Sequence, residues 1–223
     1  MNGRIYAHEF KEHRKQRPRN VPMPSVNEKL WEDFDQYFIG RGLDPDLAQF
    51  NEWYPSTDAG DAAPRVVIPC SNSLGRVYWQ ARLLPHLVLP DHEYKRYQSA
   101  HTDRAESVVI TWPEDRLTPV PHGVVLVEGP FDALAASTAG WTGVALMGDK
   151  PPPECIEYVV RIFRTSEVWR VVPDRDCPKL GAQVVRALAM LGKKARLVDV
   201  RPYKDMAAIP EGARRGFLHS YSD

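Results

Sequence analysis

The sequence predicts an α/β fold: a parallel sheet covered by helices, preceded by a smaller mixed α+β subdomain. Two patterns lead to this prediction. From Gly123 onward, short apolar stretches alternate with longer helix-like stretches, as in strands that are joined by helical crossovers. Before it, two β-branched runs flank a turn rich in Asn, Ser and Gly, which indicates a β-hairpin. Pro113, Pro119 and Pro121 mark the boundary that we expect between the two parts.

The composition is that of a globular domain without a membrane segment. Hydrophobic residues make up 43% of the 223, and basic and acidic residues balance at 29 each. No apolar run approaches the roughly 18 residues that a membrane span needs, and the first residues lack the apolar core of a secretory signal. We therefore expect a cytoplasmic protein with no membrane partner.

The three cysteines do not form a metal-binding or disulfide pattern. Cys70, Cys155 and Cys177 are isolated, and none belongs to a Cys-x-x-Cys pair. A structural zinc site needs four clustered ligands. The sequence therefore predicts neither a zinc ribbon nor a disulfide framework, and no zinc is expected as a cofactor.

The expected first subdomain covers residues 25–120 and follows a basic arm, residues 1–24. The arm is interrupted by prolines and rich in Arg and Lys, so we expect it to be flexible and able to contact phosphates through counterion release. Ser25 and Glu28 form a capping-box pattern that predicts a helix over residues 25–40. The strands of the hairpin are expected at residues 65–70 and 76–84, and a further strand-like run at 107–112.

The expected second domain, residues 121–212, alternates strands with helices and leaves residues 213–223 as a C-terminal tail. Its strands are short and continuously apolar, which is typical of a parallel sheet buried on both faces. Gly140 and Gly192 follow two helical stretches and are expected to end them. The strands are expected at residues 124–128, 142–148, 166–174 and 195–200, and the helices at 131–140, 154–164 and 179–192.

Acidic residues follow the strands of this second domain. We expect them at one edge of the sheet, because the carboxyl ends of parallel strands meet there. They are Glu128 after the first strand, Asp132 one helical turn later, Asp174 and Asp176 after the third strand, and Asp205 after the fourth.

Such a group of acids predicts a divalent metal site. Carboxylates that converge on one point repel each other unless a cation neutralises them. No His or Cys pair lies nearby, and hard oxygen ligands suit Mg²⁺ or Mn²⁺. Glu128, Asp174 and Asp176 are the candidate metal ligands, and Gly129 would let the backbone approach a bound ligand closely. A site of this kind positions phosphates and stabilises the attacking and leaving oxygens of a phosphoryl transfer.

These segments resemble the TOPRIM domain, which bacterial-type primases, topoisomerases, recombination proteins and some nucleases share. VVLVEGPFDALAA at residues 124–136 resembles its first motif. PDRDCPKLG at 173–181 resembles its Asp-x-Asp motif, and PYKDMAAI at 202–209 resembles the Lys-Asp segment of primases. The resemblance implies that the catalytic and metal-binding residues are Glu128, Asp174 and Asp176, with Asp132 and Asp205 as supporting acids.

The upstream half resembles the RNA polymerase core of bacterial- and phage-type (DnaG-like) DNA primases. The similar stretches are YFIGRGLDPDLAQF at 37–50, RVVIPCSNSLGRVYWQAR at 65–82 and YKRYQS at 94–99. The resemblance implies synthesis of short RNA primers on single-stranded DNA from ribonucleoside triphosphates. It also implies a replicative helicase as partner and a zinc-binding module supplied separately. The residues expected to bind nucleotide or template are Arg65, Arg82, and either Lys95 or Arg96.

The sequence departs from the primase pattern in three places, which suggests a divergent lineage such as a phage or mobile element. More residues than usual separate Asp176 from Gly181, Ala207 stands where a second acid is frequent, and the spacing from Tyr97 to Ser99 is one residue short. Two alternatives therefore stay open. One is a TOPRIM nuclease that activates water with the same acids, and the other is a catalytically silent nucleic-acid-binding protein.

Overall fold

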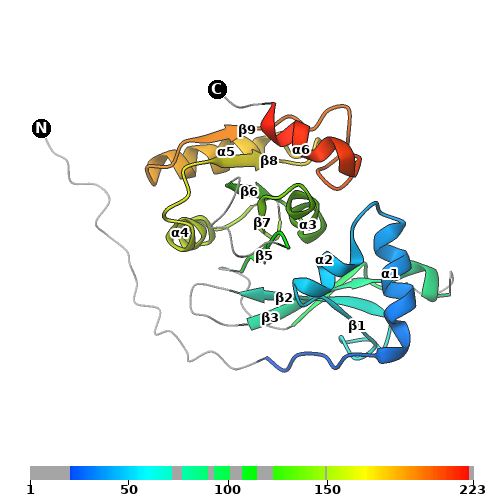
Figure 1. The fold of residues 1–223 in the computed structure, drawn as a ribbon. Coiled ribbons are helices and arrows are strands. Elements are labelled where there is room, and N and C mark those ends of the chain that lie inside the picture. The colour runs from blue at the N-terminus through cyan, green and yellow to red at the C-terminus, as the bar shows by residue number, and fades with distance from the viewer. Residues whose placement is uncertain are drawn as a thin grey trace, which may run out of the picture.

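The computed structural model of the chain describes residues 21–71, 77–89, 93–100, 107–114, 123–148 and 150–220. Figure 1 shows two sheets, one in each half of the molecule. The first half contains a four-stranded antiparallel sheet in the order β1-β2-β3-β4, and the second half contains a five-stranded sheet in the order β5-β7-β6-β8-β9. The predicted fold class is confirmed. Within the described ranges, no helix combines the length and the apolar character that a membrane crossing requires.

The first half begins with a helix that starts later than the sequence suggested. Ser25 does not cap it, because the Ser25 hydroxyl donates a 2.6 Å hydrogen bond to Asp58. Asn27 instead accepts the Lys29 N–H and starts a 3₁₀ turn that leads into the helix. The elements of this half are η1 (Glu28–Leu30), α1 (Trp31–Ile39), α2 (Pro45–Phe50), β1 (Tyr54–Ser56), β2 (Arg65–Ser71), β3 (Val77–Leu83), η2 (Pro85–Leu87) and β4 (Tyr97–Ser99).

The predicted hairpin is present as β2 and β3. The two strands pair in antiparallel register from Arg65↔Leu83 to Ser71↔Val77. Residues 21–24 of the expected arm lie against the same half, since Trp79 Nε1 donates to the Pro22 carbonyl at 3.0 Å and the Tyr54 hydroxyl to the Pro24 carbonyl at 2.8 Å. Residues 1–20 and the hairpin turn at 72–76 lie outside the described residues.

The second half has the alternating architecture that the sequence predicted. Strands β6, β7, β8 and β9 pair in parallel. Successive residues of β6 point to opposite faces, so Val125 packs in the cluster that contains Leu134 of α3, and Leu126 packs with Ile156 of α4 and Val184 of α5. The elements are β5 (Val109–Thr111), β6 (Val124–Val127), α3 (Pro130–Thr138), β7 (Thr142–Ala145), α4 (Pro153–Ile162), β8 (Trp169–Val172), α5 (Pro178–Met190), β9 (Ala195–Leu197) and α6 (Glu211–His219).

Two features of the second half differ from expectation. Strand β5 precedes the expected boundary, yet it pairs with β7 in antiparallel register and makes the five-stranded sheet mixed. Residues of the expected tail form most of α6, where Arg214 and Leu218 are buried. Two glycines lower the intrinsic helix propensity of this segment, but burial of one face against the body of the protein overrides that preference.

Several contacts between described residues join the two halves, and three kinds are clear. Phe131 of α3 inserts into an aromatic cluster of the first half, with ring centroids 5.9, 5.6 and 5.4 Å from Tyr37, Phe38 and Trp53. The Asn51 side chain accepts the Trp112 N–H at 2.7 Å and donates to the Trp112 carbonyl at 3.1 Å. Ser71 and Val108 form an isolated antiparallel bridge. One hydrophobic core therefore extends through both halves and fixes the position of the segment that follows β6.

Candidate functional site

The carboxylates that follow the strands gather at one edge of the second sheet, and we call them the acidic rim. Glu128 follows β6 directly, and Asp174 follows β8 after one proline. The Arg175 N–H donates to the Lys204 carbonyl at 2.8 Å, which brings the segment of Asp205 beside the turn of Asp174. The rim comprises Glu128, Asp132, Asp174, Asp176 and Asp205.

The electrostatics of the rim show that these acids are close enough to repel each other. Burial raises the pKa of Asp132 to about 8, and the charges of Asp205 and Asp174 add to the effect. Burial also raises the pKa of Asp174 to about 6, with further contributions from Glu128, Asp205 and Asp176. Both effects disfavour the ionised form in the absence of a cation.

Glu128 is backed by tight packing at the start of α3. A Cβ atom on Gly129 would lie only 3.0 Å from Asp132 Oδ2, so this position leaves little room for a side chain. Burial raises the pKa of the nearby Cys177 thiol to about 11, and the Glu128 carboxylate contributes to the shift. Cys177 is therefore held as a neutral thiol beside the rim, with no sign of a reactive thiolate.

A cavity of about 270 Å³ lies between the acidic rim and the first half. From the rim, Glu128, Asp132, Asp174 and Asp205 line it, whereas Asp176 is exposed and does not. The opposite side contains two arginines and two further polar side chains, which we call the basic wall. The basic wall comprises Arg41, Gln80, Arg96 and Tyr97.

The predicted basic residues are divided between this wall and the interior. Arg96 lines the cavity, while Lys95 is exposed and does not. Arg82 is buried, and its guanidinium lies 4.7 Å from the Tyr97 ring centroid, so it supports the wall from behind. Arg65 is 0% exposed and forms a two-point ion pair with Asp61 at 2.9 and 2.6 Å, which fits a structural role and not the expected contact with nucleotide or template.

Arg41 lines the cavity and is a candidate site residue that was not predicted from the sequence. Its guanidinium lies 4.8 Å from the centroid of Phe131, and within the part of the chain that the structure describes its buried Nε has no hydrogen-bond partner. An N–H of this kind at a cavity wall is suited to a ligand oxygen. The sequence signal for Arg41 is the Arg-Gly pair within the stretch at 37–50. Lys204, beside Asp205, was missed in the same way.

The donor set fits Mg²⁺ or Mn²⁺, although the side chains are not arranged as a finished site. Among the described residues, no group of three or more His, Cys, Asp and Glu could hold a metal ion as it stands. Mg²⁺ is usually bound through one or two carboxylates, with water and substrate phosphates completing its shell. Glu128 and Asp174 can supply such ligands, and their mutual repulsion is the effect that a cation would relieve.

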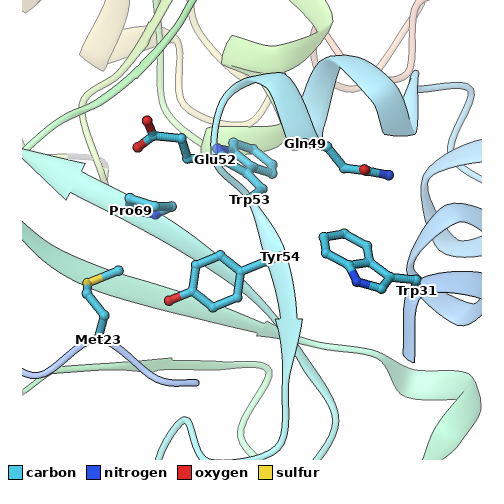
Figure 2. A pocket seen from close by; sticks show the side chains of 7 residues that line it. All are labelled: Met23, Trp31, Gln49, Glu52, Trp53, Tyr54 and Pro69. Carbon is cyan, nitrogen blue, oxygen red and sulfur yellow. The ribbon is translucent and has the colours of Figure 1, made fainter. Parts of the chain in front are cut away.

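A second hollow, of about 480 Å³, lies in the first half. Figure 2 shows Trp31, Tyr54 and Pro69 around it, with Met23 at one side. None of its lining residues belongs to the acidic rim. The smaller cavity is therefore the candidate site, because it combines opposite charges from the two halves.

No protein-family model and no curated protein matches the sequence. The structure is nevertheless similar to solved primase domains. The Aquifex aeolicus primase (zinc-binding and RNA polymerase domains) matches with 17% identity and a TM-score of 0.60, over 87% of this chain and 56% of that chain. The primase fragment of the bacteriophage T7 primase-helicase protein matches with 15% identity and a TM-score of 0.58, over 82% and 72%.

A third structure, a DnaG primase catalytic domain bound to single-stranded DNA, matches with 15% identity and a TM-score of 0.59, over 84% of this chain and 71% of that chain. The chain thus spans little more than half of the Aquifex chain in that structure and about seven tenths of the other two chains. At identities this low, the structural likeness establishes a common architecture alone. The chain has the fold of a DnaG-type primase catalytic domain.

Proposed function

We propose that this chain is the catalytic core of a DNA primase, which joins ribonucleotides on a single-stranded DNA template. The observation that carries the proposal is the cavity in which the acidic rim of the second sheet faces Arg41 and Arg96 of the first half. The primase-like fold supports it, because the likeness covers both halves of the chain. The order of the second sheet, with its antiparallel edge strand β5, is consistent with the TOPRIM resemblance of the sequence.

The reaction requires the 3′-hydroxyl of one nucleotide to attack the α-phosphate of the next, with release of pyrophosphate. Glu128 and Asp174 would hold Mg²⁺ or Mn²⁺, assisted by Asp176 and Asp205. When bound, the cation supplies charge stabilisation for the attacking and leaving oxygens. Asp132 is held by the Ala207 N–H at 2.9 Å, and we assign it a supporting position behind these ligands.

The basic wall would bind the phosphates of the incoming nucleotide and the template. Arg41 presents a planar set of donors, which suits phosphate oxygens, and Arg96 adds an exposed positive charge at the entrance. The Tyr97 ring, supported by Arg82, is suited to stacking on a base. Phosphoryl transfer depends mainly on positioning and on charge stabilisation, and this wall provides both.

The same proposal covers partners and location. Single-stranded DNA and ribonucleoside triphosphates are the expected substrates. The partners we propose are a replicative helicase, in view of the similar T7 primase-helicase fragment, and a separate zinc-binding module, in view of the zinc-binding domain of the Aquifex primase. We place the protein in the cytoplasm of a bacterial or phage-infected cell.

A single assay tests the proposal. The protein is incubated with single-stranded DNA, labelled ribonucleotides and Mg²⁺ or Mn²⁺, and we expect short RNA products. Shortened DNA would indicate the nuclease, and binding without either product would indicate the silent protein. Glu128→Gln should abolish synthesis with little effect on folding. Glu154→Gln is the matched control, because Glu154 is exposed on α4 and away from the cavity.

One structural feature weakens the alternative of a silent protein. The residues between Asp176 and Gly181 do not form a lengthened loop, because α5 begins at Pro178. Gly181 lies in the first turn of α5, where an added Cβ would be 2.4 Å from Leu197 Cδ1 and 2.9 Å from Pro173 Cγ. The departure from the primase pattern is thus absorbed by the helix start and leaves Asp174 at the cavity.

A further inference from the structure

Arg214 is a buried arginine that belongs neither to the acidic rim nor to the cavity wall. Only 1% of the residue is exposed. A buried guanidinium is tolerated when its N–H groups are bonded, so its partners indicate its role. It donates to four oxygens from three parts of the molecule: Ile209 O at 2.9 Å, Ala207 O at 3.3 Å, Thr138 Oγ1 at 3.0 Å and Gly42 O at 2.7 Å.

The first consequence concerns the segment that carries Asp205. The peptide groups around Ala207 are held from both sides, since its N–H donates to Asp132 and its carbonyl accepts from Arg214. Asp205 lies two residues before Ala207 and reaches forward to accept the Ala208 N–H at 2.8 Å. The contact between Ala207 and Arg214 is thus one of two bonds that hold the segment carrying Asp205.

The second consequence concerns the basic wall. Gly42 ends the turn after α1 with a φ of 63°, and it directly follows Arg41. One nitrogen of Arg214, Nη2, bonds both the Gly42 carbonyl and the Ala207 carbonyl. In Figure 1 the turn between α1 and α2 rises towards α6, which lies beside α3. A single guanidinium thus joins the backbone beside Arg41 to the backbone beside Asp205.

We propose that Arg214 is a positioning residue that sets the separation between the basic wall and the acidic rim across the cavity. Its effect on catalysis rests on the proposed function, whereas its effect on the coupling of the two segments does not. A lysine would keep the charge, but its compact ammonium lacks the planar fork that reaches separate oxygens. Arg214→Lys therefore tests geometry and not charge.

Arg170→Lys is the matched control. Arg170 is also buried, with 6% exposed, and it also ties α6 to the body of the protein through the Leu218 carbonyl at 3.3 Å. It also contacts the Trp169 carbonyl and the Trp141 ring, which lie in the second half as well. Both variants should destabilise α6, and only Arg214→Lys should loosen the link between the halves.

Hydrogen exchange measures this link without reference to activity. In Arg214→Lys, the amides of residues 38–44 and 203–209 should exchange about tenfold faster than in the wild type, because both segments lose the same anchor. In Arg170→Lys they should not change. If the two variants behave alike, or if Arg214→Lys affects only α6, the proposal is wrong. Should Arg214→Lys fail to fold, Thr138→Val removes one acceptor at similar volume, and unchanged exchange in both segments would contradict the proposal equally.

Activity gives the second readout. Primer synthesis is measured per folded molecule, well below the unfolding transition of each variant, so that lost stability does not count as lost activity. Arg214→Lys should reduce kcat/KM for ribonucleotides about 100-fold, as expected for a displacement of about 1 Å at the site. Arg170→Lys should retain it, and full activity in Arg214→Lys would overturn the proposal. If the wild type makes no RNA, the proposed function fails, and hydrogen exchange alone decides the role of Arg214.

Discussion

The acidic rim and the basic wall face each other across one cavity, yet they are built by different means. Glu128 and Asp174 meet because they follow neighbouring parallel strands, so backbone topology alone places them. Arg41 comes from a turn after α1, and Arg96 directly precedes β4. Both meet the rim only because the two halves pack together. One side of the site is thus fixed by a sheet and the other by an interface.

The two sides also differ in how their charges are balanced. On the rim, burial and like charges raise the pKa of Asp132 and Asp174, so the lowering contributions of the Ala207 N–H, Arg41 and Lys204 compensate the acids only in part. In the first half, Asp61 neutralises Arg65 inside the fold, and Arg82 is stacked beneath Tyr97. The role of each acid can therefore be predicted from its position after a strand, whereas the role of each basic residue depends on the groups that it contacts.

Primer synthesis should respond most strongly to substitution in the Asp-x-Asp turn, and its two acids should differ. Asp174→Asn should reduce primer synthesis about 10²- to 10³-fold, the range typical for a group that stabilises developing charge. Asp176→Asn should cost less, since Asp176 is exposed and outside the cavity lining. Asp174→Asn should leave the melting temperature unchanged or raise it, because repulsion is removed. A larger loss of synthesis in Asp176→Asn would contradict the assignment of Asp174 as the more important ligand.

The second prediction concerns the stability contributed by the ion pair between Asp61 and Arg65. Asp61→Asn leaves the buried Arg65 charge without its partner and should lower the free energy of unfolding by about 3 kcal/mol, measured by urea denaturation. Asp199→Asn removes an exposed pair with Arg201 and should have no measurable effect. Hydrogen bonds from Arg65 lower the pKa of Asp61 to about 2, so its stabilisation is present above pH 3.8 and is lost as the pH falls towards 2. Equal behaviour of the two variants would contradict this division.

A smaller effect links metal and pH. Because the pKa values of Asp174 and Asp132 are raised to about 6 and about 8, the folded state binds more protons than the unfolded state, and stability should fall as the pH rises from about 4 to 8. Mg²⁺ or Mn²⁺ should restore up to about 2.7 kcal/mol when present at 100 times its Kd. Thermal unfolding at pH 5 and pH 8 measures this, and the gain should be larger at pH 8, where protons compete less. A gain that persists in Asp174→Asn would place the metal elsewhere.

The last prediction concerns DNA binding by Arg96 and Lys95 and should give the weakest change. Arg96→Ala should weaken binding of single-stranded DNA and reduce the slope of log K against log salt by about 0.7, the value for one phosphate contact on a single strand. Lys95→Ala should change the slope less, because Lys95 is exposed and outside the cavity lining. Fluorescence titrations over a range of salt concentrations provide the measurement. The reverse order would assign the contact to Lys95.

The parts that sequence reasoning predicted are those set by local pattern. The strands and helices from Val124 to Leu197 followed from apolar periodicity, and Gly140 and Gly192 do adopt the positive φ that ends a helix. The gathering of Glu128 and Asp174 followed from strand direction. Helix α6 and the sheet partner of β5 could not be predicted, since both depend on contacts between segments distant in the chain. The same holds for Arg65, whose pairing with Asp61 no local pattern indicates.

The insertion of Phe131 has a consequence for how this architecture can change. The residue stands immediately before Asp132, so one short segment both carries a rim acid and fills the aromatic cluster of Tyr37, Phe38 and Trp53. A chimera that exchanged one half for that of a distant relative would have to transfer the matching aromatic surface with it. We expect functional chimeras to be those that keep Phe131 and its three aromatic partners together.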